Sequence, residues 1–187
     1  MFQKFSKEEV SSITAVKSSI QRSIRQKLLQ QFPLLEKNDN ELLEMIWPKK
    51  DSIQLVKCHN SLQIITLNSF PLFFQSHNDD FIPTLRLLHK YPQLLPSVTI
   101  DRGAIRFVIA GANVMSPGLT SKGGNLPPSE SAYPTNTVVS IFSEGKQHPV
   151  AIGQCKMSTE DIKKVNKGIG IDNLHYIGDG LYKFEKF

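Results

Sequence analysis

Apolar residues near the start of the chain recur at the spacing of a helix. Between residues 13 and 28 they step by three or four positions, at Ile13, Val16, Ile20, Ile24 and Leu28. Lys17, Arg22 and Arg25 fall mostly elsewhere around the same helical wheel. The pattern therefore predicts one amphipathic helix with a charged outer side.

A second helix and a set of short strands are predicted in the rest of the first half. The helix starts near Asn38 or Asp39 and stops before Trp47-Pro48, because proline cannot continue a helix. Three apolar runs, separated by polar breaks, lie at residues 53–58, 62–67 and 72–75. They predict an antiparallel meander, and a last helix from about Pro83 completes an α+β domain.

Glycine separates the chain into two halves. All eleven glycines lie between Gly103 and Gly180, and the first hundred residues contain none. Since glycine serves tight turns and close backbone approach, the halves are expected to fold as two domains. The predicted boundary places residues 1–95 in an N-terminal α+β domain and residues 96–187 in a second domain, joined near two prolines at 92 and 96.

Short strands dominate the second half. A strand at residues 98–100 leads to Asp101, a candidate N-cap for a helix that passes Val108 and ends at Gly111. Further strands are predicted at residues 113–115, 137–142, 150–154, 171–176 and 181–183. So many short strands with few helices predict a small closed or partly closed barrel, and residues 121–136 are interpreted as a solvated loop.

Composition adds a mild bias toward polyanionic partners. Lys and Arg outnumber Asp and Glu by 22 to 17, which gives a net charge of +5 and a pI near 9.2. The two cysteines, Cys58 and Cys155, are too few for a disulfide scaffold, and no apolar run approaches the ~20 residues of a membrane span. We therefore expect a cytoplasmic protein that is neither exported nor anchored.

No catalytic or cofactor motif stands out. Gly168-Ile169-Gly170 lacks the third glycine of a dinucleotide fingerprint and precedes a strand, the wrong order for such a site. Cys58-His59 has no second pair at metal-ligand spacing, and no serine lies in a nucleophile-elbow motif. The sequence thus predicts a protein that is not an enzyme and needs neither cofactor nor metal.

Basic residues form two candidate patches for nucleic acid. Lys156, Lys163, Lys164 and Lys167 surround a short segment in which Ser158 and Asp161 match a helix-capping pattern. Lys17, Arg22 and Arg25 form the second patch. Each patch could equally be a solvated helix face, and Glu160 and Asp161 partly offset the first.

Ordered pieces of the second half resemble a PUA domain, the small barrel found in RNA-modifying enzymes and translation factors. The pieces are Asp101-Arg102-Gly103-Ala104, Gly111-Ala112-Asn113-Val114-Met115, Ser116-Pro117-Gly118-Leu119, Val150-Ala151-Ile152-Gly153, Lys167-Gly168-Ile169-Gly170-Ile171 and His175-Tyr176-Ile177-Gly178-Asp179-Gly180-Leu181. The loop at residues 120–136 is longer than usual, and Tyr182 stands where Trp is common.

The whole chain resembles the malignant-T-cell-amplified-sequence family, whose fungal members are called translation-machinery-associated proteins. In the first half the resemblance rests on Gln31-Phe32-Pro33, on Pro48-Lys49-Lys50-Asp51 and on residues 83–92. It implies an N-terminal α/β pre-PUA domain packed against a C-terminal PUA pseudo-β-barrel. It also implies binding to the small ribosomal subunit, a heterodimer with the density-regulated protein, and roles in tRNA release and reinitiation.

From the resemblance and the basic patches together, a set of RNA contacts is predicted. These residues are Arg106, Gly111, Asn113, Pro117, Gly118, Lys122, Lys156, Lys163, Lys164, Lys167 and His175. Two other functions stay open: an RNA-modifying enzyme or its accessory RNA-binding subunit, and a protein adaptor whose barrel binds no RNA. The first is disfavoured by length, because the half-chain before the barrel is shorter than the usual catalytic domains of such enzymes.

Overall fold

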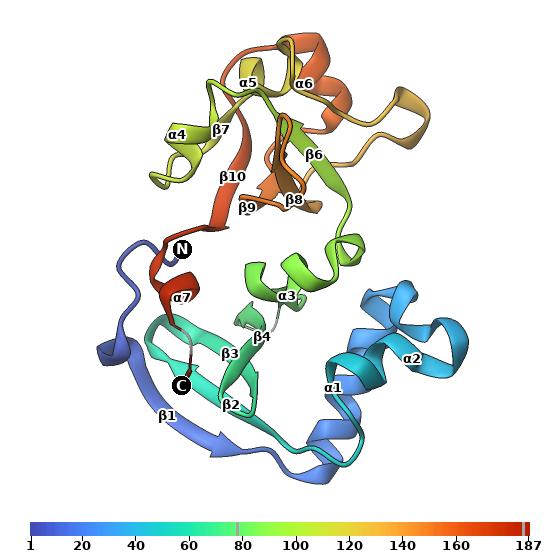
Figure 1. Ribbon diagram of the computed structural model, residues 1–187, viewed down its shortest axis with the longest axis vertical. Helices are drawn as coiled ribbons and strands as arrows, with labels where there is room; N and C mark the ends of the chain where they lie inside the picture. The colour runs from blue at the N-terminus through green and yellow to red at the C-terminus, as the bar shows by residue number, and fades with distance from the viewer. Residues whose placement is uncertain (78, 185) are drawn as a thin grey trace. The chain divides into compact units, whose positions relative to one another are not determined.

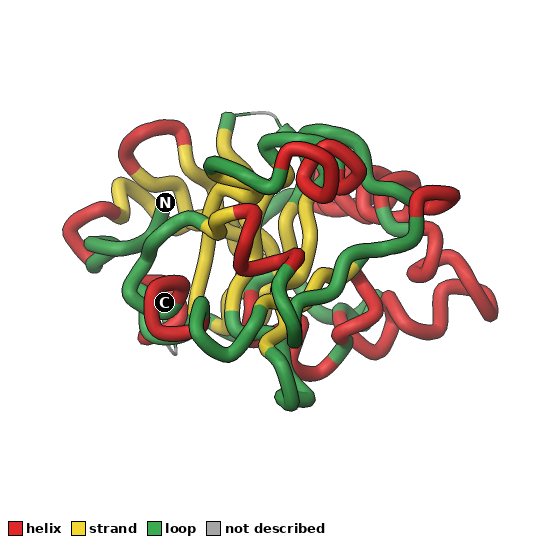
Figure 2. Tube along the Cα trace, turned by 90° about the horizontal axis from the view of Figure 1, so that it is seen from above, coloured by secondary structure: helices red, strands yellow, loops and turns green. Residues whose placement is uncertain are grey.

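The protein folds as two compact units, each with helices and strands. Figure 2 shows the helices and strands of the chain and the loops that join them. The computed structural model describes residues 1–77, 79–184 and 186–187. We call residues 6–84 with 184–187 the N-terminal unit, and residues 1–5 with 85–183 the C-terminal unit. The predicted α+β class is confirmed.

The C-terminal unit includes residues 85–95, which precede the predicted domain boundary. Helix α3 (Leu85–Lys90) belongs to the C-terminal unit, because its polar side chains bond there. Arg86 donates to the carbonyl of Tyr182 at 2.8 and 3.0 Å, and His89 lies 3.0 Å from the carbonyl of Pro149. Burial lowers the pKa of His89.

The first five residues also belong to the C-terminal unit. Phe2 is fully buried, and its ring lies 5.4 Å from that of His175 in an edge-to-face arrangement. The N–H of Gly180 donates to the carbonyl of Phe2 at 2.8 Å. The start of the chain is thereby bound to residues that lie near its end.

A five-stranded antiparallel sheet forms the centre of the N-terminal unit (Figure 1). Its strands, in spatial and chain order, are β1 (Val10–Ala15), β2 (Ile53–Cys58), β3 (Leu62–Leu67), β4 (Phe70–Ser76) and β5 (Ile82–Pro83). Each neighbouring pair is antiparallel, so the predicted meander is confirmed.

The helix predicted from Ile13 begins later than its apolar pattern suggests. Residues 10–15 form β1, in which Ile13 pairs with Val56 of β2, and the helix α1 spans Ser18–Gln31. Of the apolar residues at helical spacing within α1, only Ile24 and Leu28 are buried. For Ile13, pairing with a neighbouring strand therefore outweighs the helical spacing. Helix α2 (Lys37–Ile46) ends before Trp47, as predicted.

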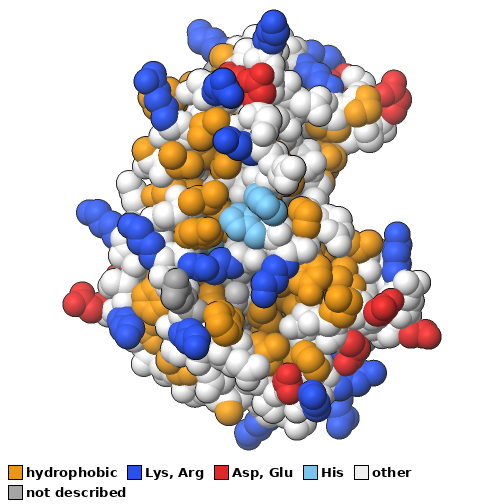
Figure 3. Space-filling model, viewed as in Figure 1, with side chains coloured by type: hydrophobic (Ala, Val, Ile, Leu, Met, Phe, Trp, Pro, Cys, Tyr) orange, Lys and Arg blue, Asp and Glu red, His pale blue; other side chains and the backbone are white. Residues whose placement is uncertain are grey.

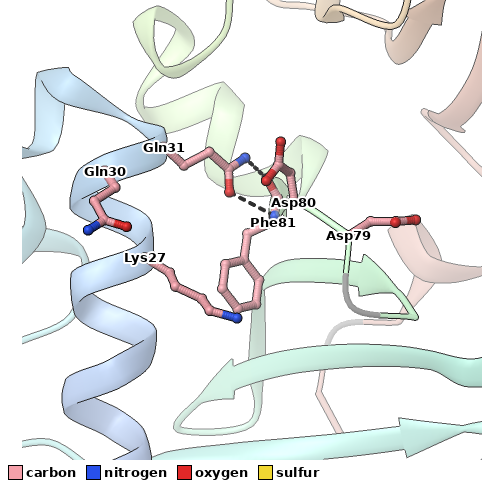
Figure 4. Close-up of a pocket in the computed structure, with 6 residues that line it drawn as sticks. All are labelled: Lys27, Gln30, Gln31, Asp79, Asp80 and Phe81. Carbon is pink, nitrogen blue, oxygen red and sulfur yellow. Dashed lines mark hydrogen bonds between the residues drawn. The ribbon is translucent and has the colours of Figure 1, made fainter.

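A side-chain amide ties α1 to the far edge of the sheet (Figure 4). Gln31 at the end of α1 donates from Nε2 to the carbonyl of Phe81 at 2.5 Å, and its Oε1 accepts the N–H of Phe81 at 2.8 Å. The amide thus pairs with both backbone groups of one residue, as a neighbouring strand would. It fixes the chain where β5 begins.

The C-terminal unit is built on a curled five-stranded sheet. In spatial order the strands are β6 (Ser97–Ile100), β8 (Val138–Ser143), β9 (Ala151–Cys155), β10 (Ile169–Tyr176) and β7 (Val114–Met115). β6 and β8 are parallel and the other pairs antiparallel. Aliphatic side chains such as Val98, Ile141 and Ile171 fill the core.

Three short helices connect these strands, namely α4 (Ile105–Val108), α5 (Ser116–Thr120) and α6 (Thr159–Val165). A fourth, α7 (Gly180–Lys183), follows β10. Within the described parts of the chain, no helix has both the length and the apolar character needed to cross a bilayer.

One predicted element of the C-terminal unit was wrong. The strand expected at residues 181–183 is α7, because Asp179 Oδ1 accepts the N–H of Tyr182 at 2.8 Å and bends the chain into a helical turn. The segment interpreted as a solvated loop is mostly exposed and is anchored at residues 125 and 126. Asn125 pairs with Thr99 of β6, and Leu126 is buried in the core.

We predict that Gln31→Glu destabilises the N-terminal unit by roughly 1–3 kcal/mol, because a carboxylate cannot donate to the Phe81 carbonyl. Urea unfolding followed by tryptophan fluorescence measures this, since the only tryptophan, Trp47, is buried in this unit. Gln30→Glu adds the same charge one residue earlier, at an exposed position, and should change the midpoint little. Equal midpoints for the two variants would contradict the role given to Gln31.

Candidate nucleic-acid interface

A groove of about 820 Å³ opens on the C-terminal unit between α4, β7 and α5. Four residues predicted from the sequence line it, namely Arg106, Asn113, Pro117 and Gly118. Arg106 lies on α4, Asn113 just before β7, and Pro117 and Gly118 on α5. The groove is therefore the first candidate site.

Asp101, at the end of β6, holds two walls of the groove together. Its Oδ1 accepts the N–H of Ala104 at 2.9 Å, just before α4 begins. Its Oδ2 accepts the hydroxyl of Ser121 at 2.5 Å, just after α5. The bond from Ser121, supported by that from Ala104, lowers the pKa of Asp101, so this carboxyl is ionised at neutral pH.

Two large apolar side chains of the groove face solvent. Phe107 is 53% exposed and Met115 50% exposed. The guanidinium of Arg106 lies over the ring of Phe107, 4.7 Å from its centroid. An exposed aromatic ring with a cation on it offers a stacking surface for a planar ligand.

Asn113 fixes the wall beside β10. Its Nδ2 donates to Asp172 at 3.1 Å, and its Oδ1 accepts the N–H of Asn173 at 2.8 Å. Lys156 lies 3.7 Å from the same carboxylate of Asp172. Asn113 thus lines the groove with both ends of its amide engaged, and Lys156 is linked to it through one carboxylate.

The net positive charge belongs to the C-terminal unit alone. This unit has twelve Lys and Arg against seven Asp and Glu, whereas the N-terminal unit has ten of each. The whole excess of +5 therefore lies on the unit that contains the groove. Figure 3 shows Lys and Arg side chains around hydrophobic ones over α4, β7 and α5.

The predicted lysines differ in how strongly they are engaged within the protein. Lys163 donates to the carbonyl of Pro127, and Lys164 lies 3.0 Å from Glu160, whose bond raises the pKa of this lysine. Among residues 1–77, 79–184 and 186–187, no acidic side chain lies within ion-pair distance of Lys122 or Lys167. These two lysines can bind an anion without losing an internal ion pair.

Lys122 and Lys167 both lie next to the groove. Lys122 follows Ser121, which lines it. The carbonyl of Lys167 accepts the hydroxyl of Ser116 at 3.3 Å, and that of Gly168 accepts the N–H of Ser116 at 2.9 Å, where β7 meets α5. The segment after α6 therefore packs against the groove wall.

Helix α6 has the cap that the sequence predicted. Ser158 Oγ accepts the N–H of Asp161 at 3.0 Å. The cap fixes the start of the helix that presents Lys163 and Lys164, both exposed.

Comparisons with known proteins agree with this architecture. A Pre-PUA-like domain matches residues 5–92, and a PUA domain matches residues 96–177. Malignant T-cell-amplified sequence 1 of Danio rerio is 50% identical over an alignment of 188 residues, which covers 100% of this chain and 99% of that protein. The chain belongs to the malignant-T-cell-amplified-sequence family.

Other members of the family come from vertebrates and fungi. Malignant T-cell-amplified sequence 2 of Homo sapiens is 47% identical over 188 residues, which are 100% of this chain and 99% of that protein. Translation machinery-associated protein 20 of Saccharomyces cerevisiae is 47% identical over 184 residues, covering 98% of each chain. The name of the yeast relative associates that protein with the translation machinery.

Solved structures share the fold at lower identity. A hypothetical protein of Pyrococcus horikoshii has a TM-score of 0.71 and 22% identity, covering 93% of this chain and 99% of its own. A PUA domain protein of Thermoplasma acidophilum has a TM-score of 0.64 and 18% identity, with the same coverage. At such identities the likeness concerns the fold alone.

Two predicted contacts of this family member have structural roles. His175 is 1% exposed and its Nδ1 lies 2.7 Å from Asp179, so its prediction as an RNA contact was wrong. Gly111 has φ of +93°, and a Cβ there would lie 2.8 Å from the hydroxyl of Tyr176, outside the groove lining. Both residues shape the barrel rather than its surface.

The second basic patch is not a single surface. Arg25 is 15% exposed; it lies 3.0 Å from Glu44, donates to the carbonyl of Trp47 and stacks on the Trp47 ring at 4.3 Å. Lys17 and Arg22 remain exposed. Arg25 therefore holds α1 to α2, and its prediction as part of an RNA-binding patch was wrong.

The N-terminal unit also has a hollow, of about 490 Å³, beside Gln31 (Figure 4). Lys27, Asp79 and Asp80 line it, so carboxylates outnumber the ammonium. Such a balance does not suit a polyanion.

Several groove residues were not predicted from the sequence. They are Asp101 as an ionised wall residue and the exposed pair Phe107 and Met115. An apolar residue at helical spacing is normally interpreted as core, so only the structure shows that these two side chains are uncovered.

We predict that Ser121→Ala raises the pKa of Asp101 toward the ordinary value of a carboxyl, because the main hydrogen bond to the carboxylate is lost. An NMR titration of the Asp101 carboxyl measures this, with Ser129→Ala, an exposed serine of the same loop, as the control.

The same change has a pH-dependent effect on stability. A pKa that is lower in the folded state than in the unfolded state stabilises the fold above the unfolded value, and this stabilisation is lost as the pH falls through the folded value. Ser121→Ala should therefore reduce the stability of the protein at neutral pH and flatten its loss in acid. A pKa of Asp101 that stays the same would show that the hydrogen bond does not form in solution.

We further predict that Arg25→Gln lowers the free energy of unfolding of the N-terminal unit by roughly 1–3 kcal/mol, because Glu44 and the Trp47 carbonyl lose their partner. Arg22→Gln removes the same charge from the exposed side of α1 and should change stability little. Urea unfolding through Trp47 fluorescence compares them. If Arg25→Gln instead weakened RNA binding at unchanged stability, Arg25 would belong to an RNA-binding patch after all.

Proposed function

We propose that this family member is a non-catalytic RNA-binding translation factor that acts on the small ribosomal subunit. The observation that carries the proposal is the exposed Phe107 and Met115 floor, next to Arg106, on the unit that holds the whole net positive charge. Protein surfaces seldom combine exposed aromatic groups and cations in one groove unless they bind something. Single-stranded nucleic acid offers the matching chemistry, namely flat bases on a phosphate chain.

In this proposal the groove binds an unpaired stretch of rRNA or tRNA. A base stacks on Phe107, and Arg106, Lys122 and Lys167 neutralise the phosphates on either side. The ionised Asp101 accepts hydrogen bonds from a base edge or a ribose hydroxyl, since a carboxylate is an acceptor only. Such contacts position RNA without changing it.

The family resemblance supports a finer proposal. With the density-regulated protein as partner, the factor would help to release tRNA from small subunits in ribosome recycling and would support reinitiation. Such a factor would act in the cytoplasm, where these steps occur. The name of the yeast relative, which associates it with the translation machinery, supports the proposal.

Phe107→Ala is predicted to weaken binding to a short single-stranded RNA by about 1–3 kcal/mol, the usual contribution of one stacked base. Fluorescence anisotropy with the purified protein measures it. Phe70→Ala, an equally exposed aromatic of the N-terminal unit at 48% exposure, is the matched control and should bind as the wild type does. Equal losses in both variants would argue against the groove.

Lys122→Glu combined with Lys167→Glu should make RNA binding less sensitive to salt. Each lost phosphate contact reduces the slope of log affinity against log salt by about 0.7 for a single strand. Lys37→Glu with Lys57→Glu, both exposed on the N-terminal unit, controls for net charge. An unchanged slope would place the phosphates elsewhere, and a modified base found by mass spectrometry would overturn the non-catalytic role.

A further inference from the structure

The outer edge of β1 in the N-terminal unit is open. β1 is the first strand of the sheet and pairs on one side only, with β2. In the described residues, no backbone hydrogen bond reaches residues 11–15 from any segment other than β2, and the N–H of Val10 donates to the carbonyl of Lys7. A strand edge of this kind offers unpaired N–H and C=O groups to another chain.

The register identifies which groups point outward. Val16 donates to the carbonyl of Ile53, and the pairs Thr14 with Leu55 and Ser12 with Lys57 continue this register at steps of two. In an antiparallel ladder, hydrogen-bonded and non-bonded pairs alternate. The N–H and C=O groups of Ile13 and Ala15 therefore point away from β2, toward the open side.

From Ser12 to Ala15 this edge lacks the features that usually prevent strand addition. Residues 10–15 contain no lysine, no proline and no charged side chain. A register shift between Val10 and Ser12 distorts one end, and the pairing is regular from Ser12 to Ala15. Four residues of regular edge remain available.

An apolar row crosses the sheet and ends at this edge. Ile13 is opposite Val56, Val56 opposite Ile64, and Ile64 opposite Phe74. The last three side chains are fully buried, whereas Ile13 is 45% exposed. One more strand would cover Ile13 and complete the row.

The residues beside the edge favour a partner with a charge of each sign. Glu8 and Glu9 precede β1, with Lys7 offsetting one of them, and Lys17 and Arg22 follow it. An added strand would thus suit a segment that places a cation near Glu8 and Glu9 and an anion near Lys17 and Arg22.

A second copy of the chain fits less well than a different protein. The regular edge is about 14 Å long for four residues, and one strand is about 5 Å from the next. Two such edges would bury far less than the ~1,200 Å² of a stable interface. A partner protein that also binds at a second surface can use a short added strand to set its alignment on β1 and its specificity.

We propose that β1 accepts an extended segment of a partner protein as a sixth strand, bonded to the backbone of Ile13 and Ala15 and packed on the Ile13 side chain. The inference rests on the proposed function in one respect, since the density-regulated protein is the partner used to test it. It is independent of the RNA groove, which belongs to the other unit.

Hydrogen exchange of backbone amides, with the purified full chain and the purified density-regulated protein, tests the proposal. The amides of Ile13 and Ala15 should exchange at least about tenfold more slowly in the complex, while those of Ser12 and Thr14, already bonded to β2, change little. Protection of none of these amides in a complex that does form would overturn the proposal and leave the partnership intact.

Two variants test the same edge by affinity. Ala15→Pro removes an outward N–H and keeps the ladder to β2, and it should weaken the complex by about tenfold or more. Ile13→Lys places a charge on the uncovered end of the row and should act similarly. Ile20→Lys, at an apolar residue on α1 with 50% exposure, is the control and should bind normally.

The remaining outcomes separate the two proposals. Trp47 fluorescence and RNA anisotropy show that each variant is folded and that its groove still binds RNA. If the wild type does not bind the density-regulated protein, the partnership and the sixth strand both fail, and RNA binding is judged by the Phe107 variants alone. If Ile13 and Ala15 become protected with rising protein concentration and no partner, the occupant is a second copy and the proposal is wrong.

Discussion

The carboxylate of Asp101 is the interaction on which the groove depends. The carboxylate joins Ala104, before α4, to Ser121, after α5. The backbone N–H of Asp101 also donates to the carbonyl of Gly118 at 2.9 Å. Three bonds at one residue fix the separation of two short helices that are too short to be stable alone. Phe107 and Met115 remain uncovered because the walls on which they lie are held apart.

Charge and apolar exposure gain meaning from where they lie. A net charge of +5 over 187 residues is unremarkable, but its confinement to one unit gives that unit the field of a much more basic protein. The N-terminal unit, with balanced charge and an open strand, is suited to protein contacts instead. One chain therefore combines two kinds of surface, with a family architecture that keeps them on separate folding units.

Much of the fold could be predicted from the sequence, because polar breaks mark where its apolar strands begin and end. The meander at β2, β3 and β4 and most strands of the barrel lie where alternation and glycine punctuation place them. The failures occurred where a distant partner decided the outcome. Ile13 became a strand residue because β2 pairs with it, and residues 181–183 became helical because Asp179 caps them.

The site was predicted less completely, for a related reason. Arg106, Asn113, Pro117 and Gly118 were found through the family resemblance, whereas Phe107 and Met115 have apolar side chains that give no sign of exposure in a sequence. For His175 and Arg25 the exposure of the side chain was overestimated. Polar residues were assumed to reach solvent, but Asp179 and Glu44 engage them inside the protein.

The buried position of Phe2 affects how the molecule can be made and divided. Ribosomes synthesise Phe2 long before the residues that cover it, near His175 and Gly180. The C-terminal unit therefore cannot close around Phe2 until those residues have been made. A fragment starting at residue 96 would lack both Phe2 and α3, leaving an unfilled cavity in the very unit it was meant to isolate.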